Sequence, residues 1–227
     1  MTSRGGGRRG LPPGVQPGLF EERARAWAAG GAPLAARMRP ASLDEFVGQE
    51  AVLGAGTPLR LMIERDEVFS LVLWGPPGSG KTTIAALMAS QTSRHFASLS
   101  AVSSGVAEVR TVVAEARDRL RISGVGTILF IDEIHRFNRA QQDVVLPHVE
   151  DGTVALVGAT TENPSFHVVA PLLSRARVFR LELLSPAEVE EILRRALADG
   201  ERGLGRLDVS VDDETLAAIV EIAAGAA

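Results

Sequence analysis

The chain has 227 residues, a formal net charge of -4, 45% hydrophobic residues and no cysteine. This composition is typical of a globular protein with a sizeable core, and it excludes disulfide bonds, thiolate metal ligands and a cysteine nucleophile. We expect a cytoplasmic protein without a membrane partner, because no apolar run approaches the roughly 20 residues of a membrane span and no secretory signal is recognisable.

In chain order, the sequence first predicts a disordered tail and then a folded α/β domain. The tail, residues 1–32, is rich in glycine, proline and arginine, and it includes a candidate short helix at 19–29. Apolar segments of strand length follow at 70–74, 95–102, 127–131, 154–159 and 178–183. Helical patterns separate them at 81–90, 106–120 and 139–146. Continuous apolar strands that alternate with helices indicate a parallel sheet covered by helices on both faces, over residues 33–184.

The pattern changes to helices alone after this domain. Ser185 is a favourable N-cap for a helix over 186–197, and a second helix is predicted over 212–224. We therefore expect residues 185–227 to begin a small all-helical lid domain. Because the sequence stops without a helix stop signal, we expect it to belong to a larger protein.

A glycine-rich loop lies between the first predicted strand and the helix that follows it. Residues 75–82 are Gly-Pro-Pro-Gly-Ser-Gly-Lys-Thr and match the P-loop pattern G-x-x-x-x-G-K-S/T at every fixed position. Backbone N–H groups of such a loop surround phosphates, and the helix dipole adds to the attraction. The alternative is a glycine-rich turn that binds nothing. The predicted ATP-binding residues of this loop are Gly75, Pro76, Pro77, Gly78, Ser79, Gly80, Lys81, Thr82 and Thr83.

Lys81 is the only lysine among the 24 basic residues of the chain. Arginine has a planar fork and cannot replace a compact ammonium group where a phosphate is held by a point charge. We expect Lys81 to contact the β- and γ-phosphates of ATP, and the hydroxyl group of Thr82 to bind Mg²⁺.

An acidic pair, Asp132 and Glu133, follows the apolar segment 127–131. Ligands of open parallel sheets bind at the carboxyl ends of the strands, where this pair is predicted to lie. Asp132 would hold the Mg²⁺ shell through water, and Glu133 would act as the general base that orients the attacking water. Such a pair can also be a helix N-cap or a solvated turn. The P-loop reading is favoured because Asp132 comes about 50 residues after Lys81, as this architecture requires.

Two further positions are candidates for the same site. Thr160 and Thr161 end the strand predicted at 154–159, where a polar side chain can sense the γ-phosphate, although simple capping is the alternative. Arg175 follows Leu-Leu-Ser and is placed to act as an arginine finger toward the nucleotide of a neighbouring subunit. The alternative for Arg175 is an ordinary surface arginine.

The residues around these motifs resemble the RarA family, the bacterial replication-associated recombination proteins also called MgsA. The family is related to the eukaryotic Werner helicase-interacting protein. The resemblance extends from Pro33 to about Leu197. The stretches that carry it are residues 33–40, 47–49, 73–78, 132–138, 141–143, 146–152 and 158–166.

This resemblance implies an AAA+ ATPase that is related to clamp loaders and to the RuvB branch-migration motor and acts on DNA at stalled replication forks. It makes Thr161 the sensor 1 residue and Arg175 the arginine finger. It also implies a homo-oligomer, commonly a tetramer, and association with the nucleoid. This chain ends near Gly225, where the sensor 2 segment is expected, so we expect weak hydrolysis from it. The residues that it implies near the adenine are Arg39, Pro40, Val47, Gly48 and Gln49.

Two rival functions remain at this point. One is a non-catalytic scaffold that recruits fork proteins when nucleotide is bound, and the other is a clamp-loader or RuvB-like branch-migration subunit. The segment Gln16–Phe20 has the form Q-x-x-L-F and resembles the peptides that bind sliding clamps, but a hydrophobic pair at a helix start is the favoured reading. A sliding clamp and a single-strand-binding protein remain candidate partners.

Overall fold

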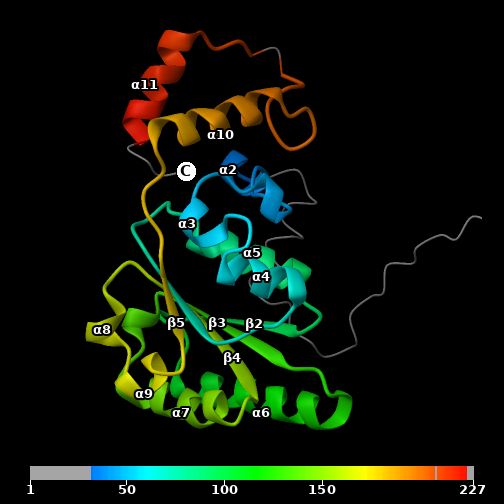
Figure 1. Cartoon of the computed structure of the whole chain (residues 1–227), viewed down its shortest axis with the longest axis vertical. Helices are drawn as coiled ribbons and strands as arrows, with labels where there is room; N and C mark the ends of the chain where they lie inside the picture. Colours follow the sequence, from blue (N-terminus) through cyan, green and yellow to red (C-terminus); the bar gives the residue numbers. More distant parts are fainter. Residues whose placement is uncertain (1–31, 208, 224–227) are drawn as a thin grey trace, which may run out of the picture.

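The computed structural model describes residues 32–207 and 209–223. In this part of the chain, a five-stranded sheet has the strand order β2-β3-β4-β1-β5, and each neighbouring pair is parallel. Figure 1 shows helices on both faces of the sheet, with α4 and α5 on one side and α6 and α7 on the other. The predicted α/β class is therefore confirmed. The strands are β1 Leu71–Trp74, β2 His95–Ser100, β3 Thr127–Asp132, β4 Val154–Thr160 and β5 Arg177–Arg180.

Helices precede, separate and follow the strands. Before β1 the chain forms α2 Leu34–Arg37, the 3-10 helix η1 Leu43–Glu45, α3 Glu50–Leu53 and α4 Pro58–Arg65. Between β1 and β5 it forms α5 Lys81–Gln91, α6 Val106–Ser123, the 3-10 helix η2 Ile134–Arg136, α7 Arg139–Glu150, α8 Pro164–His167 and α9 Ala170–Leu173. After β5 come α10 Pro186–Ala198 and α11 Asp213–Ala223.

Most elements end one to four residues from the predicted limit, and for α7 and β5 the structure shows the reason. Helix α7 continues to Glu150 although Pro147 lies inside it, where proline removes a backbone donor. A capping box between Asn138 and Gln141 and the burial of Val145 favour the helix despite that loss. Strand β5 ends at Arg180 rather than at residue 183, because its neighbour β1 gives way to the glycine-rich loop after Trp74.

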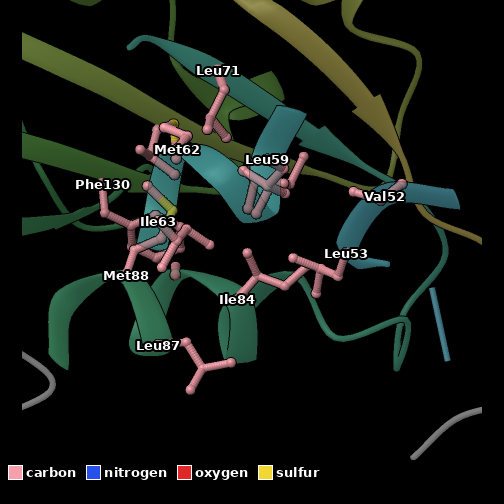
Figure 2. Packing of buried hydrophobic residues seen from close by; sticks show 14 of the residues in the cluster. Val52, Leu53, Leu59, Met62, Ile63, Leu71, Ile84, Leu87, Met88 and Phe130 are labelled. Atoms are coloured by element: carbon pink, nitrogen blue, oxygen red, sulfur yellow. The ribbon is translucent and has the colours of Figure 1, made fainter. Parts of the chain in front are cut away.

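Strand β3 separates the two halves of the core. Ile128 and Phe130 belong to a cluster with α4 and α5, whereas Leu129 and Ile131 belong to a cluster with α6 and α7. Successive side chains of a strand point to opposite faces, so a strand that is apolar at every position needs cover on both sides. Figure 2 shows the first cluster, in which Phe130 lies near residues of α4 and α5.

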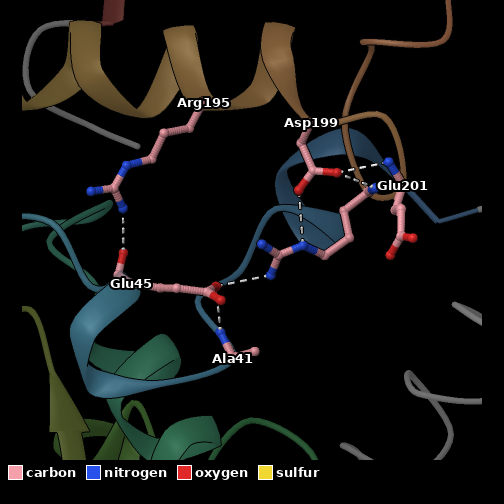
Figure 3. A network of polar contacts seen from close by, with 6 residues as sticks. Ala41, Glu45, Arg195, Asp199 and Glu201 are labelled. Atoms are coloured by element: carbon pink, nitrogen blue, oxygen red, sulfur yellow. Dashed lines mark hydrogen bonds and ion pairs between the residues drawn. The ribbon is translucent and has the colours of Figure 1, made fainter.

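Polar contacts join the helical end of the chain to the segment that precedes α3 (Figure 3). The guanidinium of Arg195 donates to the backbone oxygen of Glu45 at 2.8 Å, and that of Arg202 donates to the Glu45 carboxylate at 2.9 Å. A backbone hydrogen bond from Ala41 and the side-chain bond from Arg202 hold the pKa of Glu45 below its ordinary value. Backbone N–H groups of Arg202 and Glu201 lower the pKa of Asp199 to about 2. The lid is therefore tied to η1.

The predicted cap of the lid is present. Ser185 Oγ accepts from the backbone N–H of Glu188 at 3.3 Å, and the Glu188 carboxylate accepts from the N–H of Ser185 at 2.6 Å. We retain the division between core and lid at residues 184 and 185 as a proposal.

Some sequence predictions concern residues that the structure does not describe. The tail, except residue 32, and with it the helix at 19–29 and the segment Gln16–Phe20, lies outside the described residues. Among the helices of residues 32–207 and 209–223, none combines the length and the apolar character needed to cross a bilayer.

Candidate nucleotide-binding site

The sheet order brings the predicted site residues to one edge. Strand β4 lies between β1 and β3, so the carboxyl ends of these three strands are adjacent. Trp74 pairs with Thr160, and the N–H of Gly75 donates to the Thr160 oxygen at 3.1 Å. The glycine-rich loop, the threonine pair and Asp132 therefore meet where ligands of open parallel sheets bind.

The glycine-rich loop, residues 75–80, depends on its glycines. Gly78 and Gly80 have φ values of 78° and 92°, in the left-handed region that disfavours side chains. A Cβ atom at Gly80 would lie 2.7 Å from the Phe46 ring, and one at Gly75 would lie 2.5 Å from the Leu181 oxygen. The loop is thus packed between the segment before α3 and the chain after β5. Sequence analysis missed Phe46, because its contact with the loop bridges distant parts of the chain.

Other loop residues differ in exposure. Pro77 and Gly78 are exposed, Pro76 is half-buried, and Ser79 is buried with its hydroxyl donating to the Pro76 oxygen at 2.8 Å. Thr82 and Thr83 are half-buried in the first turn of α5. The first N–H groups of a helix have no acceptor within that helix, so this turn offers donors to an anion.

Lys81 is the first residue of α5 and extends over the loop. Its ammonium group donates to the oxygens of Gly75 at 2.8 Å and Pro76 at 2.6 Å. Burial lowers the pKa of Lys81, and the negative charge of Asp132 partly opposes this effect. A partly desolvated cation beside the first N–H groups of a helix and close-packed glycines fits a nucleotide phosphate, whose negative charge would offset the desolvation of Lys81.

The acidic pair occupies the end of β3. Asp132 is the last residue of the strand, and its carboxylate accepts from the N–H of Glu133 at 3.1 Å. Glu133 has a left-handed backbone with φ of 52°, which is rare for a residue with a side chain. Its carboxylate lies 3.3 Å from the guanidinium of Arg136, and both side chains are about half exposed. The candidate base therefore stands on a strained turn at the mouth of the site.

A magnesium ion would need ligands from the nucleotide. Within residues 32–207 and 209–223, no cluster of three or more His, Cys, Asp or Glu side chains could hold a metal ion by itself. Mg²⁺ commonly binds through one or two protein groups together with substrate phosphates. Thr82, in the first turn of α5, and Asp132, at the end of β3, fit that kind of site.

The two threonines at the end of β4 differ in burial. Thr160 is buried, and its hydroxyl is bonded to the backbone of Glu162 and to the ring of His135 at 3.0 Å. Thr161 is exposed. We therefore retain Thr161, rather than Thr160, as the proposed sensor of the γ-phosphate.

Arg175 lies just beyond α9 and is paired within its own chain. Its guanidinium is 2.8 Å from the carboxylate of Glu150, the last residue of α7, and donates to the Pro171 oxygen at 2.9 Å. The side chain is 43% exposed. A role as an arginine finger would require Arg175 to exchange Glu150 for a phosphate on another subunit.

The predicted adenine segment contacts both the loop and the lid. The amide of Gln49 donates to the Glu182 oxygen at 2.7 Å and to the Ser79 oxygen at 3.4 Å, and it accepts from the Glu182 N–H at 3.1 Å. Gly48 has φ of 74°, and a Cβ atom there would lie 2.7 Å from Leu184. Val47, Arg39 and Pro40 are half-buried. Sequence analysis missed Glu182 and Leu184, since neither belongs to a motif.

Comparison with known proteins assigns the part of the chain that carries this site to a family. Residues 38–174 match the family model described as the Holliday junction DNA helicase RuvB P-loop domain. The chain belongs to this family of P-loop domains. Members of the AAA+ P-loop class are in general ATPases, and membership implies that this chain binds a nucleotide.

Individual relatives confirm the resemblance to RarA. The chain is 50% identical over 193 residues to the replication-associated recombination protein A of Escherichia coli K12. The aligned residues cover 85% of this chain and 43% of that protein. It is 43% identical over 194 residues to the ATPase WRNIP1 of Dictyostelium discoideum, which covers 86% of this chain and 22% of that protein. The chain thus spans less than half the length of these relatives.

A solved structure shares the fold. The RuvB Holliday junction branch migration motor of Thermotoga maritima superposes with a TM-score of 0.63 and 32% identity, over 81% of this chain and 59% of that one. The higher identity to RarA makes the chain more similar to that protein than to the RuvB motor.

We predict that Gln49→Ala weakens nucleotide binding about 5- to 30-fold, because it removes the hydrogen bonds that fix the adenine segment against Ser79 and Glu182. Titration with a fluorescent ATP analogue measures this change. Gln91→Ala, at the exposed end of α5, is the matched control and should keep the affinity of the unchanged protein. Equal affinities for all three proteins would contradict a role of Gln49 in the pocket.

Proposed function

We propose that this chain is the ATP-binding and ATP-hydrolysing core of a RarA-like protein that acts on DNA at stalled replication forks. The observation that carries the proposal is the meeting of Lys81, the Asp132–Glu133 pair and Thr161 at one edge of the sheet. A phosphate grip and a carboxylate base at the same edge are the minimum that ATP hydrolysis requires.

In this proposal each residue has one task. Lys81 and the first N–H groups of α5 bind the phosphates, and the glycines of the loop let the backbone approach them. Thr82 and Asp132 hold Mg²⁺, which when bound neutralises charge on the phosphate oxygens. Glu133 orients the attacking water and accepts its proton, while Thr161 contacts the γ-phosphate. Arg175 of a second copy completes the site.

The names of the matching family and relatives support the DNA-related part of the proposal. They describe a Holliday junction DNA helicase and a replication-associated recombination protein. The chain spans 43% of the latter protein. We therefore propose, as further properties, DNA binding, tetramer formation, a sliding-clamp or single-strand-binding partner and a nucleoid location.

The test is ATP turnover by the complete natural protein that carries this sequence, with and without forked DNA and DNA with single-stranded ends. We expect both DNAs to raise the turnover rate severalfold, and Lys81→Ala to remove basal and stimulated rates alike. Turnover that no DNA changes would contradict the coupling to DNA. Tight ATP binding without turnover would favour the nucleotide-dependent scaffold.

A further inference from the structure

A polar cluster near the acidic pair has no role in the proposed mechanism of ATP hydrolysis. It consists of His135, Thr160, Glu162 and His167. His135 Nδ1 lies 3.0 Å from the Thr160 hydroxyl, and His135 Nε2 lies 3.7 Å from one oxygen of the Glu162 carboxylate. The other oxygen of Glu162 lies 2.5 Å from His167 Nε2. The two rings are 6.1 Å apart and nearly perpendicular, so one carboxylate bridges two histidines.

The cluster joins three segments that are separate in sequence. His135 is in η2, two residues after Glu133, while Thr160 ends β4, Glu162 follows two residues later, and His167 ends α8. The side chain of His135 is only 10% exposed, whereas that of Glu162 is 48% exposed. The inner end of the cluster thus lies within the fold, beside the candidate base, and its outer end reaches the surface.

The hydrogen bonds fix the direction of the His135 ring. The Thr160 hydroxyl accepts from the Glu162 N–H at 3.0 Å, and its oxygen lies 3.1 Å from the Glu162 backbone oxygen and 3.0 Å from His135 Nδ1. Because the hydroxyl has a single proton, either it donates to Nδ1 or Nδ1–H donates to it, and in both cases Nδ1 is held toward Thr160. The edge that carries Nε2 consequently faces the Glu162 carboxylate.

The turn that carries Glu133 needs such an anchor. Its left-handed backbone persists only if neighbouring contacts hold it. On the apolar side, Ile134 is fully buried against Gly158, where an added Cβ would lie 3.0 Å from the Ile134 side chain. On the polar side, the bond from His135 to Thr160 links the turn to the end of β4, which also carries Thr161.

We propose that His135 is a positioning residue that holds Glu133 in place relative to the end of β4, and that Glu162 and His167 fix the ring of His135. The inference rests on the proposed role of Glu133 as the general base. A displacement of about 1 Å at a reacting group can cost about 100-fold in rate, so this link acts on the chemical step rather than on nucleotide binding. The phosphate grip by Lys81 and α5 does not depend on it.

The test compares His135→Phe with His135→Asn in the complete natural protein. Phenylalanine keeps the ring volume but removes the nitrogen that bonds to Thr160, whereas the amide of asparagine can form a hydrogen bond with Thr160. We expect His135→Phe to lower kcat about 10- to 100-fold with KM and ATP affinity changed less than about twofold, and His135→Asn to restore most of kcat. Glu162→Ala, at a side chain that is half exposed, should lower kcat in the same way and be partly restored by Glu162→Gln.

The matched control is His148→Phe. His148 has a similarly buried side chain, 14% exposed, but pairs with Asp151 at the far end of α7. This control should leave kcat and KM unchanged. Unchanged kcat in both His135→Phe and Glu162→Ala would overturn the inference, as would an equal loss of kcat and ATP affinity without rescue by asparagine. If Glu133→Gln also leaves turnover unchanged, the proposed base is wrong; if Glu133→Gln alone abolishes turnover, only the role of His135 fails.

Discussion

Glu133→Gln is expected to bind ATP as tightly as the unchanged protein and to hydrolyse it about 10²- to 10⁴-fold more slowly. The amide keeps the size of the carboxylate but cannot accept the proton of the attacking water. The substitution also removes the ion pair with Arg136, which contributes little because both side chains are about half exposed. Phosphate release measures the rate, and titration with a fluorescent ATP analogue measures the affinity.

A matched control separates this effect from the loss of a surface charge. Glu64 also lies on the surface, where it pairs with Arg60 at 2.7 Å in α4, and its side chain is 43% exposed. We expect Glu64→Gln to keep the turnover rate within about twofold, because surface pairs of this kind are weak. A Glu133→Gln protein with normal turnover would show that another group activates the water.

Arg175→Ala is expected to lower turnover by up to about 10³-fold, the lower end of the range measured for arginine fingers. The guanidinium stabilises negative charge on the phosphate that is being transferred, so its loss slows chemistry more than it weakens ATP binding. Phosphate release at saturating ATP measures this effect. Arg121→Ala is the control, since Arg121 is exposed and pairs with Asp118 on α6.

A mixture of two inactive variants shows whether Arg175 acts between subunits. If Arg175→Ala is combined with Glu133→Gln, some interfaces pair an intact Glu133 from one copy with an intact Arg175 from the other. We expect such mixtures to recover part of the lost turnover. Failure to recover activity in mixed oligomers would place Arg175 in the site of its own chain or in none.

The pairing of Arg175 with Glu150 is compatible with this role. Both side chains are more than 40% exposed, and an exposed pair of this kind contributes roughly 0–1 kcal/mol. A phosphate on a neighbouring subunit carries more charge than one carboxylate and can displace it. The structure thus shows Arg175 in a state from which it is readily released.

The features that depend on local sequence were predicted well. The glycine-rich loop, the end of β3 at the acidic pair and the cap at Ser185 each follow from a few consecutive residues. The strands β1, β3 and β4 also had a clear signal, because they are covered on both faces and are buried along almost their whole length. The limits of β5 and α7 were less accurate, since they depend on where a neighbouring strand ends and on a capping box that outweighs Pro147.

The features that depend on distant contacts were not predicted. Phe46 reaches Gly80, Gln49 bonds to Glu182 across 133 positions, and Arg175 finds Glu150 on another helix. No local pattern specifies such pairs, because their energies arise only after the chain has folded. The contact of His135 with Thr160 likewise joins positions that are 25 residues apart.

The contacts that tie the lid to η1 have a consequence for product release. Glu45 accepts hydrogen bonds from Arg195 and Arg202, whose side chains are about 40% exposed. Water therefore competes with both contacts, and salt screens the ion pair with Arg202. In the described part of the chain, the core continues into the proposed lid through residues 181–185, where Gln49 bonds to Glu182. In the proposed ATPase, a lid that is held partly by such solvated contacts would open at low cost, so that the product nucleotide could leave without unfolding of the P-loop.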